Sequence, residues 1–353
     1  MSKLKQIKLL SRSGITVGER EITYDGHYLV TLPRLTALLQ PLPHPMTYLN
    51  AIPQAQNEPQ QLERLGAYSQ LYLEAKRLMG IHMLLSVPLV LVWVLVVAAF
   101  PTLQIYAALW GILVTLLGLF YLTPTQKKLQ KQAAKVQQLF DCDLFQLNWQ
   151  DFHNIGQPPD PEVIYRADRR YRKTNPTYER LRDWYPNVSQ LSLPLARLVC
   201  QRTNCWWDAD LRRRYASWVI MLLSIFAVVV LLVGVAGGLT LESFFLVVAA
   251  PLIPALVLGI TQYRDNMEAA NRLDQLRDRV NDIWQRALNN RETPDTLYQY
   301  SVGLQDAIFK NRAASPLIFN WFYRRLRDEN QDLMNKAAED LVQEAKAAQD
   351  QVS

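Results

Sequence analysis

The sequence predicts an all-α membrane protein with four transmembrane helices, arranged as two hairpins with cytosolic helical extensions. Two apolar runs lie within Ile81–Leu122 and are separated only by residues 101–104. A second pair, Ala216–Ala236 and Leu239–Gln262, repeats this arrangement. The basic residues that flank the runs all fall on one side of the predicted membrane. That charge asymmetry is typical of integral membrane proteins with short connections.

The first run, Ile81–Phe100, has the length and composition of a transmembrane helix. It contains no Asp, Glu, Lys or Arg and has thirteen Leu, Ile, Val or Phe residues. At about −0.3 to −0.6 kcal/mol each, these side chains contribute roughly −4 to −8 kcal/mol to membrane insertion. At about 1.5 Å per residue the run covers the roughly 30 Å hydrocarbon core. A buried soluble helix is the alternative, but four such runs in two tight pairs disfavour it.

The basic flanks predict the topology. They precede the first and third runs and follow the second and fourth, whereas the hairpin connections carry only Glu242. Both termini and the central loop are therefore expected in the cytoplasm. The residues of these flanks are Lys76, Arg77, Lys127, Lys128, Lys131, Lys135, Arg212, Arg213, Arg214 and Arg264.

These boundaries divide the chain into six segments. Residues 1–45 form an N-terminal extension with short strand-like stretches and a Pro-rich end just before Met46. It is either a small accessory element or an extension upstream of the native start. The other segments are a cytosolic helix (46–79), hairpin 1 (80–122), a cytosolic helical loop domain (123–215), hairpin 2 (216–262) and a cytosolic C-terminal helical domain (263–353).

Several helix boundaries can be predicted outside the membrane. Asn57 is a candidate N-cap of a helix that continues through Met79 into the first run. A new helix is expected at Thr123-Pro124, where proline suits the first turn. Val163–Trp184 is expected to be a polar helix interrupted at Asn175-Pro176. Leu193–Thr203 is expected to form a short apolar helix before the basic flank.

The fourth run is expected to continue as a helix to Asn290, because no helix breaker lies between Thr261 and that residue. Its apolar positions follow a short heptad pattern. They would either pack against the Asn57–Met79 helix of the same chain, which we favour, or form a coiled coil between copies. Further helices are expected to begin at Thr293-Pro294 and Ser315-Pro316.

The sequence contains no catalytic constellation. There is no phosphate-binding loop, dinucleotide-binding glycine motif, nucleophile elbow or zinc-protease motif. We therefore expect no enzyme activity, no catalytic residues, no metal and no cofactor. Cys142, Cys200 and Cys205 are expected to be buried thiols rather than zinc ligands. The runs also lack the ionisable residues of proton relays, which disfavours ion-coupled transport.

A basic and aromatic cluster is the most distinctive chemical feature of the central loop. Guanidinium groups match phosphate oxygens, and aromatic faces stack on bases, so the cluster could bind a phosphorylated small ligand. A solvated helix face paired with nearby carboxylates, or attraction to anionic headgroups, is the simpler explanation. The cluster comprises Arg166, Arg169, Arg170, Arg172, Lys173, Arg180 and Arg182, interleaved with Tyr165, Tyr171, Tyr178 and Trp184.

Several short segments resemble a known family, the bacterial S-4TM effectors. They include Asn50-Ala51-Ile52-Pro53, Phe140-Asp141-Cys142-Asp143, Trp184-Tyr185-Pro186, Gln201-Arg202-Thr203-Asn204-Cys205 and Arg325-Leu326-Arg327-Asp328-Glu329-Asn330. The resemblance extends from about residue 46 to 350. It implies a multi-pass protein of the bacterial inner membrane that acts in anti-phage defence of the CBASS type. It also implies a link to nucleotidyltransferases that make cyclic oligonucleotide messengers.

We therefore expect a signal-regulated, pore-forming or membrane-disrupting effector of abortive infection, gated by a cyclic oligonucleotide. Its partners would be the lipid bilayer, other copies of the chain in a homo-oligomer and the nucleotidyltransferase-linked signal, with no DNA or RNA polymer. The alternative is a non-conducting membrane anchor or scaffold that recruits a cytosolic partner. The candidate sensor residues are Arg166, Arg169, Arg170, Arg172, Lys173, Gln201, Arg202 and Asn204.

Overall fold

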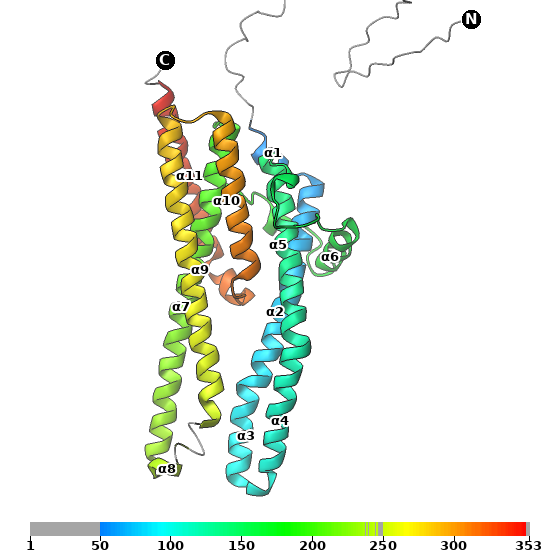
Figure 1. Cartoon of the computed structure of the whole chain (residues 1–353), viewed down its shortest axis with the longest axis vertical. Helices are drawn as coiled ribbons and strands as arrows, with labels where there is room; N and C mark the ends of the chain where they lie inside the picture. The colour runs from blue at the N-terminus through cyan, green and yellow to red at the C-terminus, as the bar shows by residue number, and fades with distance from the viewer. Residues whose placement is uncertain (1–49, 237, 239, 244, 246–249, 351–353) are drawn as a thin grey trace, which may run out of the picture. The chain divides into compact units, whose positions relative to one another are not determined.

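The computed structural model describes residues 50–236, 238, 240–243, 245 and 250–350. Within these residues the structure consists of helices and contains no strand, which confirms the all-helical prediction (Figure 1). The predictions for residues 1–45 lie outside the described residues. The elements are α1 (Ile52–Ala55), α2 (Pro59–Ser86), α3 (Pro88–Ala99), η2 (Pro101–Leu103), α4 (Gln104–Leu117), η3 (Gly118–Leu122), α5 (Thr123–Phe145), η4 (Trp149–Asp151), α6 (Pro161–Thr174), η5 (Glu179–Leu181), α7 (Leu193–Ala236), α8 (Leu241–Ser243), α9 (Ala250–Leu288), α10 (Pro294–Ala314) and α11 (Asn320–Asp350).

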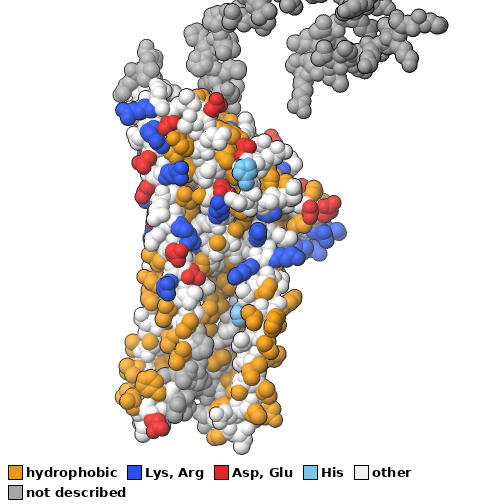
Figure 2. All heavy atoms as spheres, in the orientation of Figure 1, with side chains coloured by type: hydrophobic (Ala, Val, Ile, Leu, Met, Phe, Trp, Pro, Cys, Tyr) orange, Lys and Arg blue, Asp and Glu red, His pale blue; other side chains and the backbone are white. Residues whose placement is uncertain are grey.

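The first hairpin is formed by α2 with α3 and by α4 with its continuation into α5. The stretches Pro59–Val97 and Pro101–Phe145 are each long and apolar enough to cross a membrane. Their outward side chains are apolar, with Leu95 71% and Phe120 74% exposed. Figure 2 shows hydrophobic side chains over this end of the molecule and charged ones over the other. Such a surface suits hydrocarbon rather than water.

Two irregularities interrupt the helices of this hairpin. α2 ends before Pro88, because proline lacks the amide hydrogen and clashes with the preceding turn. The second irregularity is η3, a single π-helical segment between α4 and α5. Its Gly118 lies against His82 of α2, where an added Cβ would be 2.5 Å from the imidazole Nε2. Only glycine leaves room for this close approach.

The second hairpin begins with α7, a single helix of 44 residues. The prediction of a separate short helix over Leu193–Thr203 is wrong, because the helix continues to Ala236. After Pro194 the sequence contains no proline or glycine until Gly234, so nothing ends the helix at the basic flank. The part Leu193–Leu232 is long and apolar enough to cross a membrane. The described residues thus contain three such helices.

α9 continues from the second hairpin into the polar half of the molecule and packs along α7 (Figure 1). The predicted fourth run lies partly outside the described residues. Gly259 of α9 meets Leu223 of α7 closely, since an added Cβ would be 2.6 Å from its methyl carbons. The expectation that this helix packs against Asn57–Met79 is wrong. Its buried Leu273 packs with Cys205 of α7 and Ile308 of α10 instead.

We call the apolar runs predicted from the sequence the candidate spans, as far as the structure describes them, and the described helices outside these runs the polar half. It contains α5, α6, α10, α11 and the polar ends of α2, α7 and α9. α2 packs on α5 through small residues such as Ala67 and Ala133, and Ala167 of α6 joins the same cluster. α10 contacts α5, α7 and α9, so it joins the extensions of the two hairpins. α11 packs on α7 and α9.

The helix boundaries of the polar half test the remaining sequence predictions. α10 begins as expected after Thr293, whose side chain accepts a hydrogen bond from the Thr296 amide at 3.2 Å. Asn57 is not an N-cap, because α2 begins at Pro59 and the Asn57 side chain donates to Asp183 instead. The final helix begins at Asn320 rather than at Ser315-Pro316, since residues 315–319 are not helical. The polar helix after residue 160 ends at Thr174, close to the predicted interruption.

The three cysteines are free and buried, as the sequence predicts. Cys142 lies in α5, and Cys200 and Cys205 lie one and a half turns apart in α7. All three contribute to the packed core of the polar half.

Candidate functional site

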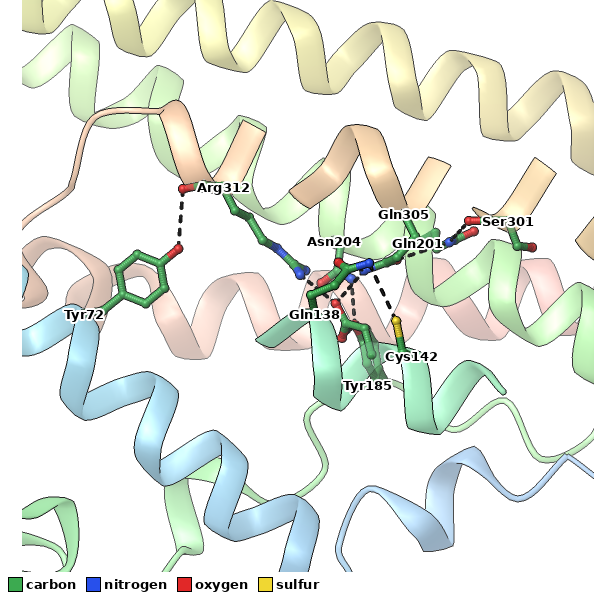
Figure 3. A network of polar contacts seen from close by, with 10 residues as sticks. Tyr72, Gln138, Cys142, Tyr185, Gln201, Asn204, Ser301, Gln305 and Arg312 are labelled. Carbon is green, nitrogen blue, oxygen red and sulfur yellow. Dashed lines mark hydrogen bonds and ion pairs between the residues drawn. The ribbon is translucent and has the colours of Figure 1, made fainter. Parts of the chain in front are cut away.

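A buried network of polar side chains lies where the extensions of the two hairpins meet (Figure 3). At its centre is Asp141 of α5, which is fully buried. One carboxylate oxygen accepts a hydrogen bond from Arg312 of α10 at 2.6 Å. The other accepts one from the Tyr185 hydroxyl, also at 2.6 Å. A buried carboxylate is stable only with such partners, so these contacts hold α5, α10 and the loop before α7 together.

Glutamine side chains extend the network from Asp141 to α7. Gln305 of α10 donates to the Asp141 carboxylate at 2.8 Å and lies 3.1 Å from the Gln138 side-chain oxygen. Gln201 of α7 donates to the Ser301 carbonyl at 2.8 Å. Asn204, one turn further along α7, donates to the Tyr185 hydroxyl at 2.7 Å. The network therefore connects α5 to α7 through α10.

The charges of the network are strongly coupled. Burial by itself would lower the pKa of Arg312, but the Asp141 carboxylate outweighs this effect and raises the pKa above its usual range. Burial, together with the Asp141 charge, raises the pKa of Tyr185 well above its usual value. Arg312 therefore stays charged and Tyr185 stays neutral, so the hydroxyl of Tyr185 remains a donor to Asp141.

The network is linked to the candidate spans by continuous helix. α5 follows η3 and α4 directly, and α7 runs from the network into the second hairpin. A helix rises about 1.5 Å per residue, so the fourteen residues from Asn204 to Trp218 place the network roughly 20 Å from the start of the apolar part of α7. A displacement of α5 against α7 at the network would therefore move the spans.

A cavity of about 170 Å³ lies beside the network. It is bordered by α2, α5, α7, α10, α11 and the loop before α7, so its walls come from the extensions of both hairpins. Its lining includes the aromatic side chains Tyr68, Tyr72, Trp184, Trp207 and Tyr323, the cations Lys76, Arg182, Arg212, Arg312 and Arg327, the carboxylates Asp183 and Asp208, and Ser315.

Two pairs of aromatic rings line the cavity. Tyr68 of α2 and Trp184 of the loop meet edge to face, with ring centroids 5.7 Å apart. Trp207 of α7 and Tyr323 of α11 form the second pair, with centroids 6.3 Å apart. Aromatic faces in a cavity are suited to stacking on planar rings of a ligand.

The cations of the cavity are only partly neutralised. Arg212 pairs with Asp208 at 3.0 Å. Lys76 donates to the Asn320 side-chain oxygen at 2.7 Å, and Arg327 donates to the Arg180 carbonyl; neither forms an ion pair with a carboxylate in the part of the chain that the structure describes. The buried hydroxyl oxygen of Ser315 has no hydrogen-bond partner among these residues either. The cavity is therefore suited to an anionic ligand with hydrogen-bonding groups.

The structure separates the sensor residues predicted from the sequence. Arg166, Arg169, Arg170, Arg172 and Lys173 all lie on the exposed surface of α6, outside the cavity lining. On α7, Arg202 donates to Asn281 of α9 at 2.8 Å, and Gln201 belongs to the buried network. Of the eight predicted residues, Asn204 alone lines the cavity.

The sequence analysis missed most residues of the network and the cavity. Trp184 was noted as part of the aromatic cluster, but Trp207 and Tyr323 are far from it in the sequence and fall in different helices. A buried charge at Arg312 or Asp141 also has no recognisable local signal. The one available signal was the polar segment Gln137-Gln138 beside Asp141, on a helix whose neighbouring positions are apolar.

The fold and this site define a helical membrane protein whose polar half combines a buried junction with an aromatic and cationic cavity. The chain belongs to the family described as SMODS-associating 4TM effector domain, whose model matches residues 50–341. This confirms the resemblance found in the sequence, and the family name implies four membrane spans. The chain is also similar to a protein of Bacillus cereus (strain VD146) named "Probable CBASS effector molecule", with 23% identity over 203 residues. The match covers 57% of this chain and 66% of that relative. No solved structure matches the chain.

Proposed function

We propose that this protein is a membrane effector of bacterial anti-phage defence that is gated by a cyclic oligonucleotide and permeabilises the inner membrane. Its family and the name of its Bacillus relative support the defence role. Its three described apolar helices support action in the bilayer. The proposed activity is not enzymatic: the ligand changes helix packing, and no bond is made or broken.

The proposed topology places both termini and the polar half in the cytoplasm, where such a messenger is made. Arg213 and Arg214 of α7 directly precede the apolar part of the second hairpin, and Lys127 and Lys128 of α5 directly follow that of the first. Basic residues are retained on the cytoplasmic side of bacterial membrane proteins. The loop tips carry Glu242 and no basic residue, which agrees with this orientation.

The gating proposal rests on the lining of the cavity. A cyclic oligonucleotide combines phosphates with planar bases, and the extensions of both hairpins contribute cations and aromatic rings to the cavity lining. Charge-assisted bonds from Lys76 and Arg327 would hold phosphate oxygens. The Tyr68–Trp184 and Trp207–Tyr323 pairs would stack on the bases, because every base offers a π-face.

The mechanism follows from where the cavity lies. A ligand that contacts α2 on one wall and α7 or α11 on the other favours one separation of the two hairpin extensions. Binding shifts the equilibrium towards the packing in which the ligand has the better contacts. Because the extensions of α5 and α7 continue into the candidate spans, this change alters span packing and opens a path for ions among several copies of the chain.

The test is ion flux from liposomes that contain the purified protein, measured with and without cyclic oligonucleotides. We expect flux only with a matching ligand. Trp184→Ala and Trp207→Ala should each weaken activation about tenfold or more, since stacking contributes roughly 1–3 kcal/mol per base. The matched control is Arg279→Glu on α9, an exposed cation outside the cavity lining, which should leave activation unchanged.

The opposite result is equally informative. Full activation of both tryptophan variants would overturn the cavity proposal. Membrane potential in cells gives the second test. Growth arrest with an unchanged potential would reject permeabilisation and favour the non-conducting scaffold.

A further inference from the structure

The outer face of α6 carries three cations that have no carboxylate partner in the described residues. Arg170 forms an ion pair with Glu74 of the same chain, and Arg172 forms one with Asp168, each at 2.7 Å. Arg166, Arg169 and Lys173 are exposed and form no ion pair there. Their spacing of three and four residues places them in one stripe along the helix. We call these three residues the basic stripe; Figure 2 shows Lys and Arg side chains gathered on this flank.

α11 carries the opposite charge. Between Asp328 and Asp350 it has seven acidic residues and two lysines. Asp328, Asp332 and Glu339 are exposed and form no ion pair within the described chain, unlike Glu329, which pairs with Arg214 at 3.0 Å. Their spacing of four and seven residues places them within about 40° of one another around the helix, at about 100° per residue. We call these three residues the acidic stripe.

The two stripes lie at the same end of the molecule. Arg327, which precedes the acidic stripe directly, donates a hydrogen bond to the carbonyl of Arg180, in the segment that follows α6. Both helices belong to the polar half, away from the candidate spans (Figure 1). Two copies that stand side by side in one membrane would therefore present the stripes on the same side of the bilayer.

The helices that carry the stripes belong to different halves of the fold. α6 packs on α2, in the extension of the first hairpin, and α11 packs on α7 and α9, in the extension of the second. A contact between two unlike surfaces of identical chains is heterologous, and it closes into a ring when the rotation between copies allows it. Rings about an axis normal to the membrane require the complementary surfaces to lie at the same depth, as these do.

We propose that the basic stripe of one copy (Arg166, Arg169 and Lys173) docks on the acidic stripe of a second copy (Asp328, Asp332 and Glu339). This contact rests on the proposed function, which requires assembly of several copies but does not specify the surface through which they assemble. Exposed charge pairs contribute mainly orientation and specificity. Confinement of both copies in one bilayer supplies the high effective concentration at which such weak contacts suffice.

Charge reversal tests the pairing. Arg166→Glu with Arg169→Glu should lower the yield of chemically cross-linked oligomers in membranes at least several-fold, and Asp328→Arg with Asp332→Arg should do the same. The variant that carries all four changes should regain most of the yield, because the pairing is restored with the charges exchanged. Thermal unfolding of each purified variant establishes that it folds.

An introduced disulfide gives a direct measurement. The native cysteines are buried, so Arg169→Cys combined with Asp332→Cys provides the reactive thiols. Mild oxidation should give covalent dimers and higher oligomers, whereas each single variant should give none by this route. The control pair, Arg169→Cys with Asp295→Cys at the start of α10, should stay monomeric.

Two results would overturn the interface. They are an oligomer yield unaffected by either reversal and failure of the fourfold variant to regain it. Cross-linked oligomers that give no ion flux would reject the proposed pore but support the interface.

Discussion

The two helical hairpins, with their extensions, are built differently. In the first, α2 is interrupted at Val87 and the second span carries the π-helical turn at Gly118. In the second, α7 runs for 44 residues without interruption. Ion pairs also gather on the second, where Arg213 pairs with Asp274 and Arg214 pairs with both Asp210 and Glu329. The first depends more on close packing of small residues, such as Gly66 beneath Asp168.

This difference indicates how a signal could act. A long helix braced by several neighbours moves as a rigid body, whereas a helix with a proline break and a π turn has places to bend. We infer that the second hairpin acts as the frame and the first as the deformable part. The junction of Asp141 with Arg312 and the cavity beside it lie where the two meet. Three further predictions test this comparison.

The largest effect is expected at the junction itself. Arg312→Ala leaves the Asp141 carboxylate buried without its cation, which typically costs about 3–5 kcal/mol. The melting temperature in detergent should fall by about 4–7 °C, because an unfolding entropy of about 2.1 cal/mol/K per residue corresponds to roughly 1.4 °C per kcal/mol for 353 residues. The exposed Arg279→Ala change on α9 is the matched control and should have little effect.

A double substitution distinguishes two causes of the lower stability of Arg312→Ala: the unpaired charge of Asp141 and the loss of a large side chain. Arg312→Met with Asp141→Leu removes both charges and should recover part of the stability, because no buried charge is left unpaired. The remainder stays lost, since the Tyr185 hydroxyl and the Gln305 amide lose their acceptor. If Arg312→Ala melted like the wild type, the junction would not hold the halves together.

An intermediate effect is expected at the π turn of the first hairpin. Gly118→Ala introduces a methyl group 2.5 Å from the His82 ring and should cost about 1–3 kcal/mol through overpacking. Gly111→Ala is the matched control, since nothing lies within 4 Å of its added Cβ. His82→Ala should relieve the strain of Gly118→Ala in the double variant. Equal melting of the Gly111 and Gly118 variants would contradict the close approach.

The smallest effect is expected from the surface ion pairs of the second hairpin. Arg214 is 37% exposed, so its pairs with Asp210 and Glu329 are screened by water. Arg214→Ala should cost less than about 1 kcal/mol, and high salt should reduce the difference further. A loss of many degrees in the same unfolding measurement would show that these pairs, rather than helix continuity, make the second hairpin rigid.

The membrane helices were predictable from the sequence because their signal is local. A run such as Ile81–Phe100 carries its own hydropathy, and every backbone group of a helix is satisfied within the run itself. The same holds for the start of α10 after Thr293, where the capping residue and the proline are neighbours. The long helix after residue 261 was also expected for this reason, since no breaker interrupts it.

The features that could not be predicted from the sequence depend on contacts between residues that are far apart in the chain. The partner of α9 could not be chosen from its apolar stripe, because α2 and α7 offer similar apolar faces; the close fit of Gly259 on Leu223 belongs to the pair α9 and α7. Asp141 meets Arg312 across 171 positions, and Trp207 meets Tyr323 from another helix. The sequence by itself determined the apolar runs, the basic flanks and the family. The cavity, the buried junction and the placement of α6 outside them required the packed fold, because burial and pairing are properties of neighbours in space.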